Sequence, residues 1–213
     1  MIIIFYIFVL QFNVIIMDLF ENESVSEFIS NAAEYCTFLE NTSNFSRTDF
    51  VKRAIELFSA LYFYGNKLPS FELEEEAQLE KFVTELDWNS IYDKVKEKLG
   101  YHDEYLDLYD PVAKEEEELS ILSLADNFAD IYQDLKDFTT IYGIGNEEMM
   151  QAALWELNYN FEQYWGPKLL NALRILHRLF YSDDIDLEEE QESGSSEDEN
   201  QQNKNWLFDQ RKG

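Results

Sequence analysis

The stretch Glu147–Tyr181, EEMMQAALWELNYNFEQYWGPKLLNALRILHRLFY, decides the fold. Apolar residues recur in it at spacings of three and four, which is the pattern of one face of an α-helix. Further aromatic and aliphatic residues lie on its other sides, so we expect neighbouring helices to cover it at the centre of a bundle. The residues of the main stripe are Met150, Leu154, Leu157, Phe161, Tyr164, Leu169, Leu173, Leu176 and Phe180.

A glycine and a proline interrupt this stretch. Pro167 has no N–H to donate to the carbonyl of Gln163, and the residue before a proline is disfavoured in helical geometry. We therefore expect Gly166 to leave the helical conformation. The sequence predicts a break or sharp kink here, which divides the stretch into two helices.

Four further helices are predicted before this stretch, each from an apolar 3.6-residue period with a start or stop signal. With three prolines and seven glycines in 213 residues, long helices are favoured over a turn-rich β fold. The sequence thus predicts an all-α protein, a single bundle of five or six helices. The residues that start these helices, in chain order, are Ser24 with Glu27, Thr48 or Asp49, Thr84 with Asp87, Ser120 or Ser123, and Asn146 for the last stretch. The first helix is expected to end at about Glu40, the second at Gly65, the third at Gly100, and the fourth at Gly143 and Gly145.

Composition divides the chain into three parts. Residues 1–17 form an apolar leader, which is shorter than the roughly 20 residues of a transmembrane helix and which we interpret as an over-extended gene start before Met17. The bundle domain is expected over residues 18–181. Residues 182–213 form an acidic tail, in which 183–199 hold ten acidic and no basic side chains, and we expect it to be disordered.

Net charge limits the partners. The chain carries 44 acidic and 16 basic residues, a formal charge of −28. Such a field repels nucleic acid and anionic membranes, unless residues 1–16 are a real membrane anchor. A basic-surfaced protein partner, a bound cation and plain solubility remain open as its role, and solubility is the simplest of them. The single cysteine, Cys36, excludes an intrachain disulfide and indicates the cytoplasm.

Four aspartates form the most regular polar pattern. Asp126, Asp130, Asp134 and Asp137 fall within about 80° of arc on one predicted helix. Carboxylates in such a row are suited to Mg²⁺ or Mn²⁺, whereas the alternative is a solvated helix face. No cofactor is indicated, because the usual nucleotide, metal and hydrolase motifs are missing from the sequence.

A second pair of polar residues lies on the last predicted helix. His177 falls inside the apolar face of this helix and Arg174 at its edge, which is typical of a core histidine and a rim arginine that pairs with a carboxylate. The alternative is a polar pocket in which both residues meet Asp130 and Asp134. These four residues are the candidate catalytic set.

The segments LADNFADIYQDLKDF, ALWELNYNFEQYWG and NALRILH resemble a bacterial family of helical proteins called domain of unknown function 5063. The resemblance runs from about Asp18 to Tyr181. In that family histidines flank the Trp-Gly step, where this chain has Tyr164 and Lys168 instead. The resemblance implies a helical fold and a bacterial origin, and it implies no activity.

Three functions remain open from the sequence, one of which, an acidic decoy for a basic-surfaced protein, is supported by net charge alone. The acidic surplus without a catalytic motif favours a non-enzymatic cytosolic protein-interaction module. The alternative is a metal-dependent hydrolase-type enzyme that uses the aspartate row with Arg174 and His177. A concave pocket that unites these side chains would favour the enzyme, and a closed core would favour the module.

Overall fold

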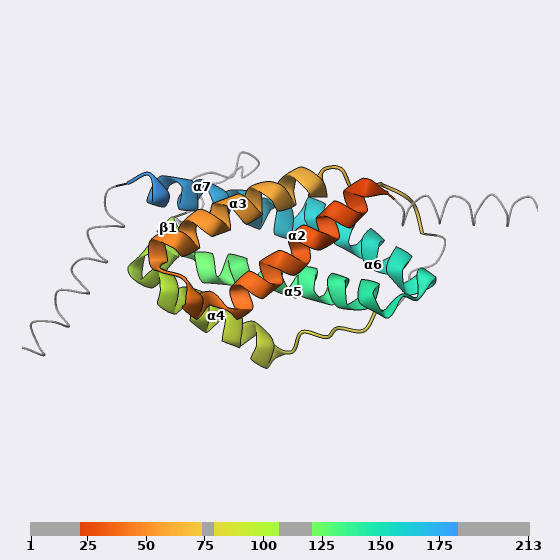
Figure 1. The fold of residues 1–213 in the computed structure, drawn as a ribbon, viewed down its shortest axis with the longest axis horizontal. Helices are drawn as coiled ribbons and strands as arrows, with labels where there is room; N and C mark the ends of the chain where they lie inside the picture. Colours follow the sequence, from red (N-terminus) through yellow and green to blue (C-terminus); the bar gives the residue numbers. More distant parts are fainter. Residues whose placement is uncertain (1–21, 74–78, 107–120, 183–213) are drawn as a thin grey trace, which may run out of the picture.

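The computed structural model describes residues 22–73, 79–106 and 121–182. It confirms the all-α fold: a bundle of helices with one small two-stranded hairpin (Figure 1). The predictions for the apolar leader and for the acidic tail from residue 183 concern residues outside the described ranges. The elements are α2 Glu23–Glu40, α3 Arg47–Gly65, α4 Glu85–Leu99, β1 Glu104–Leu106, β2 Ile121–Ser123, α5 Leu124–Ile144, α6 Glu147–Asn160 and α7 Gly166–Phe180.

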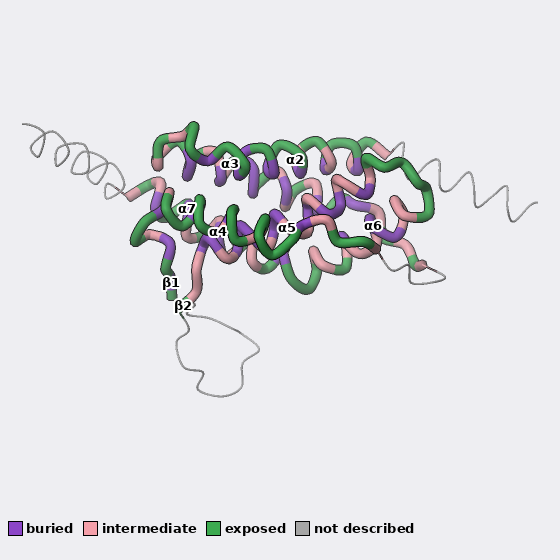
Figure 2. Tube along the Cα trace, turned by 90° about the horizontal axis from the view of Figure 1, so that it is seen from below, coloured by how far each residue is buried: buried purple, intermediate pink, exposed green. Residues whose placement is uncertain are grey.

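Helix α5, rather than the stretch 147–181, is the centre of the bundle. It packs against α2, α4, α6 and α7, whereas α7 packs mainly against α3 and α5. The expectation that other helices cover 147–181 on all sides is wrong, because Tyr159, Tyr164 and Leu170 stay exposed. Figure 2 shows the buried residues of the helices turned towards one shared interior.

Aromatic side chains fill that interior. Phe28, Phe50, Phe58 and Phe128 have no exposed surface, and Phe58 and Phe128 lie 4.8 Å apart between ring centroids. The buried hydroxyl of Tyr35 donates to the Phe128 carbonyl at 2.9 Å, so the one polar atom of this ring is satisfied. The core therefore fixes α2 and α3 on α5.

Most helix ends agree with the local signals. Thr84 caps α4 in a full capping box, Ser123 caps α5, and Asn146 caps α6. Gly100 and Gly145 follow α4 and α5 with φ values of 59° and 76°, which only glycine adopts easily.

Two predicted caps are wrong by two or three residues. The cap of α2 is Asn22, whose side chain accepts the Ser24 N–H at 2.9 Å. The cap of α3 is Ser46, which accepts the Asp49 N–H at 3.1 Å, so Asp49 completes the first turn instead of starting it. Several polar residues cluster before each helix, and only the backbone shows which is the last extended one.

Gly65 does not end α3 as a left-handed cap. It is the last residue of the helix, it is buried, and Asn66 follows in helical conformation. A Cβ atom at Gly65 would lie 3.2 Å from the ring of Phe161, so the glycine allows α3 to approach the segment between α6 and α7.

The break predicted at Gly166 is replaced by a π-helical turn, Phe161–Trp165, that joins α6 to α7. Gly166 keeps helical angles (φ −62°, ψ −52°), and its N–H donates to the Phe161 carbonyl five residues earlier. Pro167 then lies at the start of α7, where an N–H is not needed. A Cβ atom at Gly166 would lie 2.2 Å from that same carbonyl oxygen, so this turn requires glycine.

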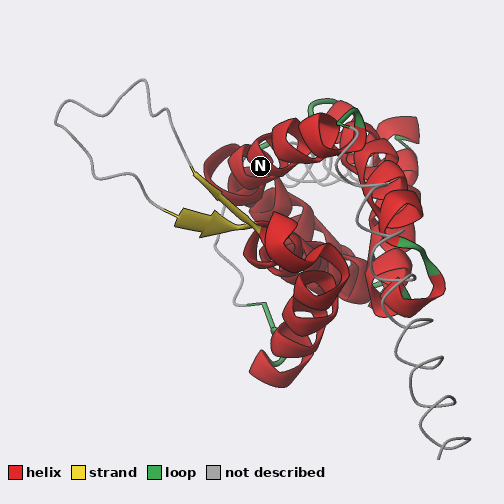
Figure 3. Ribbon diagram, turned by 90° about the vertical axis from the view of Figure 1, so that its left-hand side faces the viewer, coloured by secondary structure: helices red, strands yellow, loops and turns green. Residues whose placement is uncertain are grey.

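The hairpin of β1 and β2 was not predicted. Its strands pair antiparallel with Tyr105 opposite Leu122, and it projects from one side of the bundle (Figure 3). Asp103 fixes its base, because the buried carboxylate accepts from Ser123 Oγ at 2.9 Å and from the Ala125 N–H at 2.7 Å. Strands of three residues are too short for a period-two pattern to be recognised.

Candidate functional site

The aspartate row lies along α5, in the seam between α4 on one side and α6 and α7 on the other. Asp137 is buried with 3% of its surface exposed, and Asp126, Asp130 and Asp134 are half-buried. The interpretation of the row as a solvated face is therefore wrong. Each carboxylate instead accepts hydrogen bonds from groups on neighbouring elements.

The first two carboxylates of the row are joined to two residues that sequence reasoning missed. Lys168 of α7 forms ion pairs with both Asp126, at 3.3 Å, and Asp130. The indole N–H of Trp88 on α4 donates to Asp130 at 2.8 Å. Asp130 therefore links α4, α5 and α7. The family resemblance, which implies a histidine at the position of Lys168, is the one signal that could have drawn attention to it.

The last carboxylate of the row anchors the chain before α4. Asp137 Oδ1 accepts the backbone N–H groups of Phe82 and Val83 at 2.8 and 2.9 Å. These donors belong to an extended segment that would otherwise leave them without a partner. The role of Asp137 is thus structural.

Asp134 has a different environment. It accepts from the Asn160 amide at 3.1 Å and lines a small cavity of about 20 Å³, large enough for a single water molecule. The ion pair between Lys81 and Glu156 borders the same cavity. Burial raises the pKa of the Asp134 carboxyl to about 6, and Glu156 and Asp130 add to the rise.

The other two candidate residues do not join this row. Arg174 and His177 are both exposed on α7, so the prediction of a core histidine is wrong. The His177 ring lies against Tyr181, with 4.7 Å between ring centroids, and Arg174 makes no ion pair with any residue that the structure describes. The helical wheel misplaced them because α7 buries a narrower stripe, which includes Leu169, Ala172 and Leu176.

Metal binding by the row receives no support from these positions. Within residues 22–73, 79–106 and 121–182, no three His, Cys, Asp or Glu side chains are arranged to hold a metal ion. The oxygen atoms of the row face nitrogen donors instead. The catalytic role of Asp130, Asp134, Arg174 and His177 stays a prediction.

A larger opening lies on the other side of α5. This groove of about 370 Å³ runs between α4, α5 and the end of α2, and we call it the α2–α4–α5 groove. Val83 and Ile91 supply apolar wall, and the polar lining includes Asp87, Ser90, Lys94 and Lys136. Its size is within the range of ligand-binding pockets. Sequence reasoning missed it because its walls come from three separate parts of the chain.

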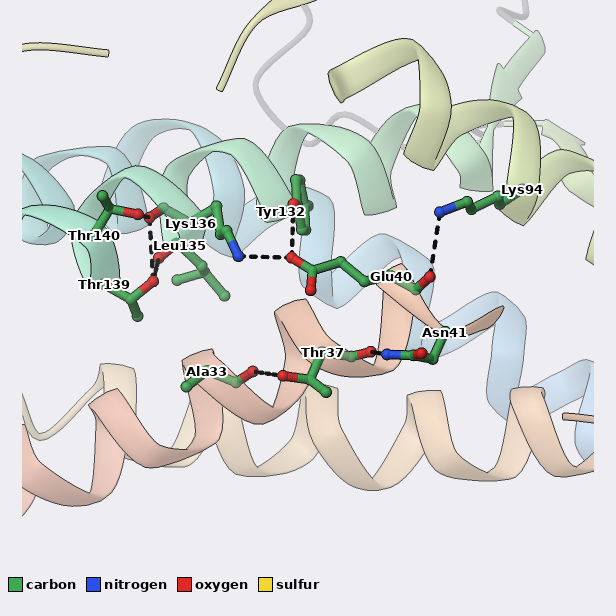
Figure 4. Close-up of polar contacts among 10 residues, drawn as sticks. All are labelled: Ala33, Thr37, Glu40, Asn41, Lys94, Tyr132, Leu135, Lys136, Thr139 and Thr140. Atoms are coloured by element: carbon green, nitrogen blue, oxygen red, sulfur yellow. Dashed lines mark hydrogen bonds and ion pairs between the residues drawn. The ribbon is translucent and has the colours of Figure 1, made fainter. Parts of the chain in front are cut away.

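Glu40, the last residue of α2, lines this groove, and its side chain points towards Tyr132 and Lys136 of α5 (Figure 4). One of its carboxylate oxygens, Oε1, accepts from the Tyr132 hydroxyl at 3.0 Å and from Lys136 Nζ at 2.6 Å. Lys94 Nζ donates to the backbone carbonyl of Glu40 at 3.2 Å. The groove therefore contains a charged cluster that links α2, α4 and α5.

These contacts change the acidity of the donors. The hydrogen bond with Glu40 raises the pKa of Lys136, and Asp87 contributes in the same direction. Burial and the bond to Glu40 raise the pKa of the Tyr132 hydroxyl. Both groups keep their protons at neutral pH, so they act as donors. Lys136 is the one basic residue of α5, a signal visible in the sequence.

Over the described part of the chain, no helix has the length and the apolar character required to cross a membrane. No curated protein matches the chain. The fold is similar to the crystal structure of protein BF1032 from Bacteroides fragilis, with a TM-score of 0.69 and 31% sequence identity. That similarity covers 77% of this chain and 96% of the other.

A family model described as "Domain of unknown function (DUF5063)" matches residues 20–182. This match includes the helices that carry the aspartate row and all three walls of the groove. It confirms the resemblance stated from the three sequence segments. The protein belongs to the DUF5063 family.

Proposed function

We propose that the protein is a non-enzymatic protein-interaction module that binds a basic-surfaced partner in the α2–α4–α5 groove. The observation that carries this proposal is the groove itself, an open space of about 370 Å³ with apolar wall and charged rim. Such a surface suits a protruding side chain of another protein, which buries its stem and pairs its charged end.

The charge of the chain supports a basic partner. The described residues contain 22 acidic and 12 basic side chains, a balance of −10, and the whole chain reaches −28. A field of this sign accelerates association with positively charged surfaces and disfavours acidic ones.

The polar groups of the groove support binding more than catalysis. Glu40, Tyr132 and Lys136 bond to one another, and Asp87 accepts from the hydroxyl and the N–H of Thr84. Side chains held by such hydrogen bonds are fixed in position and can recognise a ligand. Catalysis would instead need a nucleophile or base with a neighbouring group that activates it.

A blocking variant tests the proposal. Ser90 lines the groove and is exposed, so Ser90→Arg should fill the groove and add a repelling charge without disturbing the core. The matched control is Asn89→Arg, one position along α4 and about 100° around the helix.

Binding of a short arginine-rich peptide is measured by nuclear magnetic resonance on the full chain. We expect shifts at groove residues, a loss of affinity of at least about tenfold in Ser90→Arg, and little change in the control. A peptide that binds both variants equally, or that leaves the groove signals unmoved, would contradict the proposal.

The second candidate is the metal-dependent hydrolase-type enzyme predicted on Asp130, Asp134, Arg174 and His177, now restricted to Asp130 and Asp134 because Arg174 and His177 are exposed on α7. One observation favours it: the raised pKa of Asp134, about 6, is suited to general acid or base chemistry near neutral pH. Calorimetric titration with Mg²⁺ or Mn²⁺, repeated with Asp134→Asn, tests it. Binding that the variant abolishes would support the enzyme.

Two more expectations accompany the proposal. We propose the cytoplasm as compartment, supported by Cys36, a buried free thiol. We also keep the division into residues 1–17, 18–181 and 182–213. Expression from Met17 and limited proteolysis of the tail, each followed by thermal melting, test this division.

A further inference from the structure

We infer that the Glu40 carboxylate is the receptor for an arginine side chain of the partner, and that Lys136 occupies this receptor in the free protein. The inference rests on the proposed function and names the chemistry of its ligand. In the free protein, Lys136 then takes the place at Glu40 that the partner's arginine takes in the complex.

The described residues engage one oxygen of the Glu40 carboxylate. Both of its donors, Tyr132 and Lys136, bond to the same oxygen, Oε1. The other oxygen, Oε2, accepts from no residue in the described ranges. A guanidinium presents parallel N–H groups that engage both oxygens of a carboxylate, whereas an ammonium is a single point charge. Arginine therefore fits this carboxylate better than Lys136 does.

The internal ion pair can be exchanged. The side chains of Glu40 and Lys136 each keep 38% of their surface exposed. An ion pair this open to water contributes little to stability, so its release costs little. After release, Lys136 still has Asp87 as a negative neighbour at the groove.

The chain already pairs a guanidinium with glutamates elsewhere. Arg53 of α3 contacts both Glu34 of α2 and Glu56, the latter at 2.7 Å. Arg53 gives one nitrogen to each of these two carboxylates. At Glu40, an arginine from outside would instead engage both oxygens of one carboxylate, with its aliphatic stem in the groove that Val83 and Ile91 line.

The groove by itself is electrically balanced, since Glu40 and Asp87 offset Lys94 and Lys136. An acidic ligand that binds the two lysines is therefore the main competing possibility. The surplus of ten acidic charges over the described residues disfavours it. The two ligands predict opposite effects of removing Lys136, which makes the question testable.

The experiment compares three probes on the full chain: a short peptide with one central arginine, the same peptide with citrulline, and the same peptide with glutamate. Citrulline keeps the shape of arginine without its charge. Affinities come from nuclear magnetic resonance titration, and thermal melting checks that each variant folds. The variants are Lys136→Met, Glu40→Gln, and Lys52→Met as a control, since Lys52 is exposed on α3 and loses the same charge.

We expect Lys136→Met to strengthen arginine-peptide binding by about 3- to 10-fold, because it removes the internal competitor. Glu40→Gln should weaken it by about 10-fold, and citrulline should bind as weakly. Lys52→Met should change affinity much less than Lys136→Met does.

Three outcomes would overturn the inference. Weaker arginine-peptide binding by Lys136→Met would mean that Lys136 does not compete with the arginine. Preference for the glutamate peptide would mean that the lysines of the groove are the receptor. Arginine-peptide binding in the groove that Glu40→Gln leaves unchanged would overturn the inference while the proposed function stands. The proposed function fails separately, if no basic peptide shifts the groove signals and Ser90→Arg has no effect.

Discussion

Replacing Asp134 with asparagine should stabilise the protein at neutral pH, because it removes a carboxylate whose charge is costly where it lies. Asp134 is half-buried at a cavity of about 20 Å³, with Glu156 and Asp130 nearby. Asparagine has the same shape, and its carbonyl can still accept from the Asn160 amide, which now bonds to Asp134 at 3.1 Å.

The pKa of Asp134 sets the size of the effect. It is raised from 3.8 to about 6, and one pKa unit corresponds to about 1.4 kcal/mol. Asp134→Asn can therefore raise the free energy of unfolding by at most about 3 kcal/mol, and we expect an increase of about 1 to 3 kcal/mol above pH 6. The folded state holds this proton more tightly than the unfolded state. The wild type therefore loses stability as the pH rises from 3.8 to 6, and the advantage of the variant vanishes below pH 4.

Urea unfolding followed by circular dichroism, at several pH values between 4 and 8, measures this difference. The matched control is Asp137→Asn, the same change one turn along α5. It should destabilise by about 1 to 3 kcal/mol, because Asp137 accepts two backbone N–H groups as a charged acceptor. A destabilised Asp134→Asn, or a gain that does not depend on pH, would refute the reasoning.

Four further substitutions test other parts of the fold. Gly166→Ala should lower the free energy of unfolding by about 1 to 3 kcal/mol, because the new Cβ would lie 2.2 Å from a backbone carbonyl oxygen. Gly143→Ala should raise the free energy of unfolding by about 0.5 to 1 kcal/mol, because its Cβ would meet nothing within 4 Å; thermal unfolding measures both. Trp88→Phe should cost about 1 kcal/mol in urea unfolding, because it removes the indole donor of Asp130, and equal stability would contradict that bond. Thr84→Ala should cost about 0.5 to 2 kcal/mol by the same measurement, because α4 loses its cap, and the loss should be absent if α4 begins elsewhere.

The fold class and most helix ends could be predicted from the sequence because their causes are local. A 3.6-residue apolar period requires a helix with one buried face, wherever that face is later placed. Thr84, Ser123 and Asn146 cap their helices with side chains that accept the backbone N–H three residues later. The family resemblance also rests on contiguous segments, and the match over residues 20–182 confirms it.

The aspartate row shows where local reasoning ends. Its spacing places four carboxylates on one side of α5, and that prediction is correct. Their partners, however, lie far away in the chain: Trp88 is 42 residues from Asp130, and Phe82 is 55 residues from Asp137. A hydrogen bond between such residues depends on how the helices pack, which periodicity does not encode. The same limit explains the misplaced His177, since a helical wheel cannot tell how wide a stripe the neighbours cover.

The sequence by itself thus determined the helices, their order and their acidic surface. Only the tertiary structure decided which helix is central, how closely Gly65 approaches the ring of Phe161, and that Glu40, Asp87 and Lys136 meet in one groove. The physical reason is the distance along the chain over which each interaction acts. Helix formation and capping act over about four residues, whereas packing, burial and charge pairing join atoms that only the folded chain brings together.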